Sequence, residues 1–140
     1  MIGDHLTVGV DGSPAGMAAL GWALAEGARS GYRVHVVTVG RADEPDAELD
    51  TAVAAAVAAH PRASVWRRRL PGSPGPELVR VSFDSALLVV GVRRAGHALL
   101  TLRGSVSAYC ARHACCPVVV VPADSRTMTS PATPLSGAAR

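Results

Sequence analysis

Short apolar runs alternate with helix-forming segments along this chain, and this alternation restricts it to few folds. The runs are rich in Val and Leu and lie at residues 6–10, 34–39, 64–70, 86–90 and 117–121. Four of them are nearly continuous, which is typical of parallel strands that are buried on both faces. Strands that alternate with helices build doubly wound sheets through right-handed crossovers. The sequence therefore predicts an α/β domain with an open parallel sheet and helices on both faces.

The segments between the runs carry helix signals. Ser13 is placed to cap the first helix, Pro14 suits its first position and Gly31 suits its end. The other predicted helices are an Ala-rich helix that stops at His60-Pro61, a short helix over about 77–83 and a last helix over 105–113, with residues 71–76 as a loop. Arginines at 67–69 indicate that the third strand lies at an edge of the sheet.

Length and composition indicate one domain. The 140 residues suffice for one sizeable core, which Val, Ala and Leu must fill because aromatic residues make up only 4%. From residue 123 on, Ser, Thr, Pro, Ala and Gly dominate without periodicity. This composition predicts a domain over residues 1–122 and a disordered tail over 123–140.

Charge and patterning argue against several classes of function. The net charge is +3, and the 14 basic residues are all Arg without interleaved aromatics, so nucleic-acid binding is not expected. The chain shows no signal peptide and no membrane-spanning run, which predicts a cytoplasmic protein. Cys110, Cys115 and Cys116 lack the spacing of a metal site and are expected to be small core residues. His113 is expected to pack against the core, whereas His35 and His60 belong to no recognisable constellation.

The stretch at residues 87–107 predicts an anion site. An apolar run stops at Gly91, and Gly104 precedes Ser105 at the start of the last predicted helix. A strand that feeds a helix through a glycine-containing loop leaves backbone N–H groups free, and the helix dipole favours a negative charge there. The same serines also suit helix capping, and Asp11 also suits a turn before the first helix.

Four segments of the sequence resemble the universal stress protein family. They are VGVDGSP at 8–14, LLVVG at 87–91, GSVS at 104–107 and HACCPVVVV at 113–121, and the resemblance covers about residues 4 to 121. It implies a fold like that of the adenine nucleotide alpha hydrolases, with strand order 3-2-1-4-5. It also implies a homodimer through the last strand at Val118–Val121.

The resemblance further implies a nucleotide site. Members that bind ATP use a loop of the form G-x2-G-x9-G-S/T around the phosphates, an aspartate after the first strand and the end of the second strand. Carried onto this sequence, the nucleotide-binding residues are Asp11, Val39, Gly91, Arg94, Gly104, Ser105, Val106 and Ser107. The implied ligand is ATP or a related adenine nucleotide, with Mg²⁺.

Arg94 departs from the family pattern because it stands where the second glycine of the loop belongs. Its guanidinium either contacts a phosphate, which Arg suits well, or fills the site. The leading hypothesis is therefore a regulator of the stress response that binds an adenine nucleotide. The alternative is a degenerate member that has lost nucleotide binding and acts as a dimeric module for an unknown protein partner. An enzyme is not expected, since the chain has no Lys and shows no nucleophile–base pair. Slow ATP hydrolysis stays open as a third hypothesis, because positioned phosphates and Mg²⁺ need little more.

Overall fold

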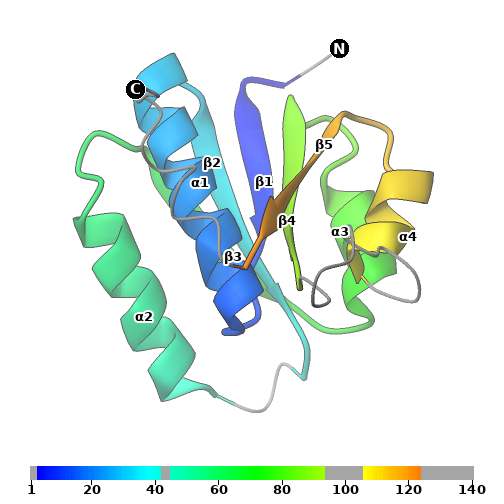
Figure 1. Ribbon diagram of the computed structural model, residues 1–140, viewed down its shortest axis with the longest axis horizontal. Helices are drawn as coiled ribbons and strands as arrows, with labels where there is room; N and C mark the ends of the chain where they lie inside the picture. The colour runs from blue at the N-terminus through cyan, green and yellow to red at the C-terminus, as the bar shows by residue number, and fades with distance from the viewer. Residues whose placement is uncertain (1–2, 42–44, 94–105, 124–140) are drawn as a thin grey trace.

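The computed structural model describes residues 3–41, 45–93 and 106–123. Five parallel strands form one sheet in the order β3-β2-β1-β4-β5, as Figure 1 shows. The strands are β1 (His5–Gly9), β2 (Arg33–Val39), β3 (Val65–Leu70), β4 (Leu87–Val92) and β5 (Val118–Pro122). The predicted fold class and strand order are confirmed.

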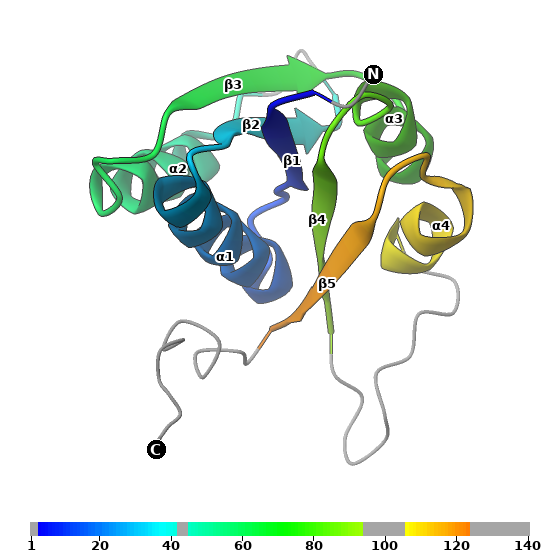
Figure 2. The same cartoon turned by 90° about the horizontal axis from the view of Figure 1, so that it is seen from above.

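Four helices cover the two faces of the sheet. They are α1 (Pro14–Ser30), α2 (Ala47–Ala58), α3 (Pro74–Val81) and α4 (Val106–His113). Seen from above in Figure 2, α1 and α2 lie on one face and α3 and α4 on the other. Each face has its own apolar cluster: Val8, Leu20 and Leu24 lie in the first, and Leu78 and Leu88 in the second. Aliphatic side chains therefore fill the core on both sides, as the composition predicts.

The predicted ends of α1 are confirmed. The Ser13 side chain accepts a hydrogen bond from the Gly16 N–H at 3.0 Å, and Pro14 occupies the first turn. Gly31 adopts the left-handed conformation with φ 84°, and its N–H donates to the Gly27 carbonyl. The cap at Ser13 fixes the first turn of α1 at the carboxyl end of β1.

Helix α3 begins earlier than the sequence predicts. The helix begins at Pro74, so the prediction of a loop over 71–76 is wrong for its last three residues. The prolines at 74 and 76 are compatible with the helix because N–H groups in a first turn have no intrahelical partner. Gly75 lets α4 approach, since a Cβ there would lie 2.9 Å from the Tyr109 ring. The helix ends at Val81, two residues before the predicted end.

The region around α4 corrects two further expectations. His113 is exposed, and its ring lies 4.3 Å from that of Tyr109 instead of packing in the core. Cys110 is buried as predicted, and burial raises the pKa of its thiol to about 11. Cys116 is partly buried, but Cys115 is exposed, so its prediction as a core residue is wrong. Thiolate chemistry is disfavoured at Cys110, because its thiol stays protonated at neutral pH.

The two edge strands of the sheet differ in charge. On β3, Arg67 and Arg69 both reach Asp50 of α2, at 2.7 and 3.5 Å, so these arginines form ion pairs at the edge. On β5, residues 118–120 are apolar and half-buried. No helix in the described ranges is long and apolar enough to cross a membrane. The predicted tail lies outside the described residues from 124 on.

Candidate functional site

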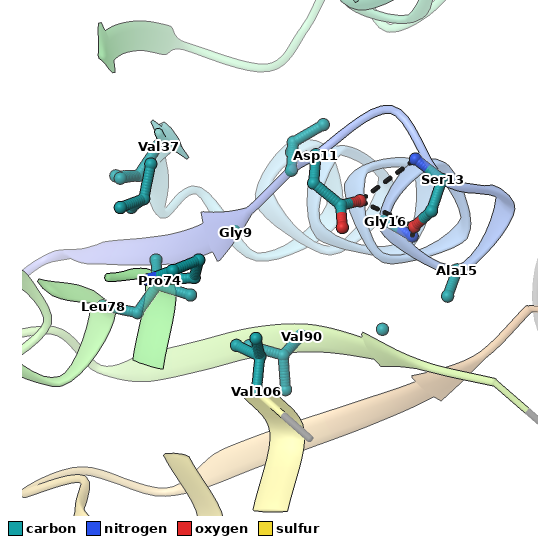
Figure 3. Close-up of a pocket in the computed structure, with 13 residues that line it drawn as sticks. Gly9, Asp11, Ser13, Ala15, Gly16, Val37, Pro74, Leu78, Val90 and Val106 are labelled. Atoms are coloured by element: carbon teal, nitrogen blue, oxygen red, sulfur yellow. Dashed lines mark hydrogen bonds between the residues drawn. The ribbon is translucent and has the colours of Figure 1, made fainter. Parts of the chain in front are cut away.

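A pocket opens at the carboxyl ends of β1 and β4, where the chain leaves the two neighbouring strands toward opposite faces of the sheet. We call it the switch-point pocket, and Figure 3 shows its lining. Its empty space, including the opening to solvent, is about 490 Å³. It is lined by Gly9, Val10, Asp11, Ser13, Ala15, Gly16, Val37, Val39, Pro74, Leu78, Val90, Gly91 and Val106. Ligands of doubly wound sheets bind at this position.

One side of the pocket is apolar. Leu78 of α3 packs onto β1 at Gly9, where a Cβ would lie 2.6 Å from the leucine Cδ1 atom. Pro74, Val90 and Val106 continue this side, as Figure 3 shows. Aliphatic walls of this kind suit a flat ring that is stacked against them.

The opposite side of the pocket carries Asp11. Its Oδ1 atom accepts from the Ser13 N–H at 3.0 Å and from the Ser13 hydroxyl at 2.6 Å. Among the described residues, the hydrogen bonds to this carboxylate all reach Oδ1. In Figure 3 the carboxylate points toward the space between β1 and β4. Asp11 therefore stabilises the turn before α1 and keeps one oxygen for a ligand, so its two predicted roles are compatible.

Val39 lines the pocket where β1 and β2 separate. The Val37 carbonyl accepts from the Val10 N–H at 2.9 Å, and the Gly40 N–H donates to the Leu70 carbonyl of β3 at 2.9 Å. Residues of a parallel strand alternate between their two neighbours, so Val39 directs its N–H and carbonyl toward β1. Within the described ranges no β1 residue pairs with them. Val39 therefore presents one donor and one acceptor at the pocket.

Gly91, a predicted nucleotide-binding residue, lines the pocket, but packing gives a separate reason for glycine at this position. A Cβ at this position would overlap the carbonyl group of Ala15 in the first turn of α1. The close approach of α1 to β4 thus requires glycine at 91 whether or not a ligand is bound. Gly91 alone is therefore weak evidence for phosphate binding.

The structure brings only part of the predicted phosphate site together. Val106 lines the pocket and is 39% exposed. Ser107 is buried, at 1% exposure, and is not among the lining residues. Arg94, Gly104 and Ser105 lie outside the described residues. The roles of these residues in phosphate binding remain predictions.

Sequence reasoning missed several lining residues. Pro74 and Leu78 belong to α3, and the predicted loop over 71–76 removed the start of this helix from the site. The capping signal of Ser73 followed by Pro74 could have located it. Ala15 and Gly16 carry no functional group, so only the three-dimensional packing places them at the pocket.

A second hollow continues from the switch-point pocket over the ends of β2 and β3. The two share Asp11 and Val39, and the hollow contains about 920 Å³ of empty space that is open to solvent. Arg41, Arg69 and Asp46 also line it. No three His, Cys, Asp or Glu side chains within residues 3–41, 45–93 and 106–123 are placed to hold a metal ion. The described residues therefore provide no cluster to bind the Mg²⁺ that the resemblance implies.

Comparison with known proteins assigns this chain to a family. Residues 4–122 match the pattern of the universal stress protein family. The chain belongs to this family. The universal stress protein Rv2623 of Mycobacterium tuberculosis is 29% identical over 151 residues, which cover 90% of this chain and 50% of the relative. This universal stress protein therefore spans about half the length of the curated relatives that it matches.

Solved structures share the fold of this universal stress protein. A universal stress protein in complex with cAMP gives a TM-score of 0.72 at 24% identity, over 89% of this chain and 100% of that one. One from Archaeoglobus fulgidus DSM 4304 gives 0.71 at 23% identity, over 86% of this chain and 45% of that one. A universal stress protein from Archaeoglobus fulgidus in complex with dAMP gives 0.62 at 22% identity, over 86% and 99%. At these identities the similarity establishes the fold.

Proposed function

We propose that this universal stress protein binds an adenine nucleotide in the switch-point pocket. The observation that carries the proposal is the pair of polar groups that open into one apolar pocket, the Val39 backbone and the Asp11 Oδ2 atom. Adenine offers an amino donor beside a ring-nitrogen acceptor, which complements a backbone carbonyl and N–H. Ribose hydroxyls donate to a carboxylate oxygen. Aliphatic side chains on the other side of the pocket suit the flat base.

Two solved relatives support the choice of an adenine nucleotide. One is a structure in complex with cAMP and another is a structure in complex with dAMP. ATP is the form that we propose here, with its phosphates directed to the connection between β4 and α4 and with Mg²⁺ held through those phosphates. The Arg94→Gly variant separates the two roles of that arginine, because nucleotide affinity rises if Arg94 fills the site and falls if it contacts a phosphate.

The nucleotide acts as a signal in this proposal and is not turned over. The family to which the chain belongs supports a role in the stress response, which we place in the cytoplasm. The sequence contains no Lys that could neutralise developing charge on a phosphoryl group, and Asp11 is the one carboxylate among the described residues that line the switch-point pocket. A phosphate-release assay on the nucleotide-bound protein tests this point, and multiple turnovers would contradict it.

A second candidate function rests on β5. This strand is at an edge of the sheet, and its apolar residues 118–120 are half-buried. Unpaired apolar edges favour pairing with another chain. A homodimer through Val118–Val121 that acts on an unknown protein partner, without nucleotide, is therefore the alternative. A monodisperse monomer at micromolar concentration would contradict the dimer.

Calorimetry with ATP on the full chain tests the proposed function. The Asp11→Asn variant keeps an oxygen for the two Ser13 donors and turns an NH₂ group toward the pocket, so an acceptor is lost while the turn is kept. We expect nucleotide affinity to fall about tenfold or more, the usual effect of losing a charge-assisted hydrogen bond. The control is Asp4→Asn, which changes an exposed carboxylate paired with Arg33, and it should bind as wild type does.

Two observations together would overturn the proposal of nucleotide binding. Protein purified from cells would release no nucleotide, and millimolar ATP would give no heat of binding. In that case the dimeric interaction module is the remaining candidate function.

A further inference from the structure

The carboxylate of Asp11 lies against the first turn of α1. Ser13 donates two hydrogen bonds to the Oδ1 atom, and the Ser13 hydroxyl accepts one from the Gly16 N–H at 3.0 Å. Gly16 itself lies directly beside the carboxylate. A Cβ at residue 16 would lie 2.5 Å from Asp11 Oδ1, 3.1 Å from the Asp11 backbone nitrogen and 3.4 Å from the Ser13 hydroxyl.

The helix gives no other reason for glycine at this position. Gly16 lies in the third position of α1, and its φ is not among the positive values that occur at Gly12, Gly31 and Gly72. Alanine is favoured over glycine in helices because it loses less backbone entropy on folding. The nearest atom to the missing Cβ is the end of a flexible side chain, so an alanine can be accommodated if the Asp11 carboxylate moves.

We infer that Gly16 is a positioning residue for the nucleotide site, because the absence of its side chain lets the Asp11 carboxylate lie against α1 with Oδ2 directed into the pocket. This inference rests on the proposed function, in which Asp11 contacts the nucleotide. Gly16 lines the same pocket, but the proposed effect of its missing side chain on the ligand acts through Asp11.

Gly21 offers a matched control on the same helix. A Cβ at residue 21 meets no atom within 4 Å, so Gly21→Ala makes the same chemical change in open space. The experiment compares wild type, Gly16→Ala and Gly21→Ala in two measurements on the full chain. The first is the ATP dissociation constant, alone and in the Asp11→Asn background. The second is the amide proton shift of Ser13 by NMR without nucleotide, since that N–H loses its carboxylate acceptor if Asp11 moves.

We expect Gly16→Ala to stay folded, to shift the Ser13 amide resonance and to weaken ATP binding about tenfold, the usual effect of one lost charge-assisted hydrogen bond. Gly21→Ala should change neither quantity. In the Asp11→Asn background the effect of Gly16→Ala on affinity should disappear, which a general loss of structure would not produce.

Three results would overturn the inference: an unchanged Ser13 resonance in Gly16→Ala, ATP binding as tight as in Gly21→Ala, or an equal loss of affinity with Asn at residue 11. If the wild type binds no ATP, the proposed function fails separately. The Ser13 resonance then decides alone whether Gly16 sets the position of the carboxylate.

Discussion

The two ends of the sheet both carry polar side chains, but they use them differently. At the amino end, five residues form what we call the amino-end cluster: His5, Thr7, His35, Trp66 and Ser85. The Ser85 hydroxyl lies 2.6 Å from the Thr7 hydroxyl and 3.0 Å from His5 Nε2. The rings of His35 and Trp66 stack at 4.5 Å. The Thr7, Ser85 and His5 side chains hydrogen-bond to one another and stabilise the fold, whereas His35 Nε2 is buried without a hydrogen-bond partner among the described residues.

At the carboxyl end, the polar groups are only partly used by the protein. One carboxylate oxygen of Asp11 accepts hydrogen bonds from Ser13, and the other is open to the pocket. The backbone of Val39 lies beyond the last backbone hydrogen bond between β1 and β2. Both open into the switch-point pocket. The difference between the two ends indicates that a cluster of His, Ser and Thr side chains is not by itself a ligand-binding site. Unused donors and acceptors at a pocket are the better signal.

We expect the largest loss of stability from a substitution of Gly91 at the carboxyl end of the sheet. Gly91→Ala places a Cβ onto the Ala15 carbonyl, where backbone would have to move. We expect the free energy of unfolding to fall by about 3 kcal/mol or more, at the upper end of overpacking. Gly40→Ala at the same end is the control, because a Cβ there meets no atom within 4 Å. Equal urea midpoints for the two variants would show that packing does not explain Gly91.

The next largest expected effect is a dependence of stability on pH that comes from His35 of the amino-end cluster. Burial lowers the pKa of His35 from 6.5 to about 4, and the positive charge of Arg68 adds to this. Between pH 6.5 and pH 4 the imidazole of His35 is protonated in the unfolded chain but stays neutral in the folded protein. The free energy of unfolding therefore has its full value above pH 6.5 and decreases as the pH falls toward 4. The total loss from this residue is about 3 kcal/mol.

Urea unfolding between pH 7 and pH 4 measures this loss. His35→Phe keeps a ring for stacking on Trp66 and removes the titrating group, so its stability should depend less on pH than that of wild type. The same pH dependence in both proteins would contradict the assignment.

The smallest effect tests whether the amino-end cluster is mainly structural. Thr7→Val keeps the shape of the buried side chain and removes the hydroxyl that lies 2.6 Å from Ser85. We expect a loss of about 1 kcal/mol in unfolding free energy, because Ser85 retains His5 as a partner. ATP affinity should stay unchanged. A weaker affinity would break the contrast between the two ends of the sheet.

The sequence predicted the parts of this molecule that local chemistry controls. Strand order followed from the family resemblance, and the cap at Ser13 followed from residue types alone. The start of α3 was missed because two prolines and a glycine usually indicate a loop, and Pro74 was therefore not expected at the wall of the pocket. His35 joins residues from other strands that are far apart in sequence, so no local spacing could have revealed its cluster.

We propose that the open polar groups at the carboxyl end bind an adenine nucleotide while the amino-end cluster does not. Amide NMR of the labelled full chain during titration with ATP tests it most directly. We predict saturable shifts at the Val39 amide and around Asp11, with the amides of Thr7 and His35 unmoved. GTP should shift the Val39 amide far less, because guanine presents its donor and acceptor in reversed positions. Saturation without a shift at Val39, or shifts centred on Thr7 and His35, would contradict the account.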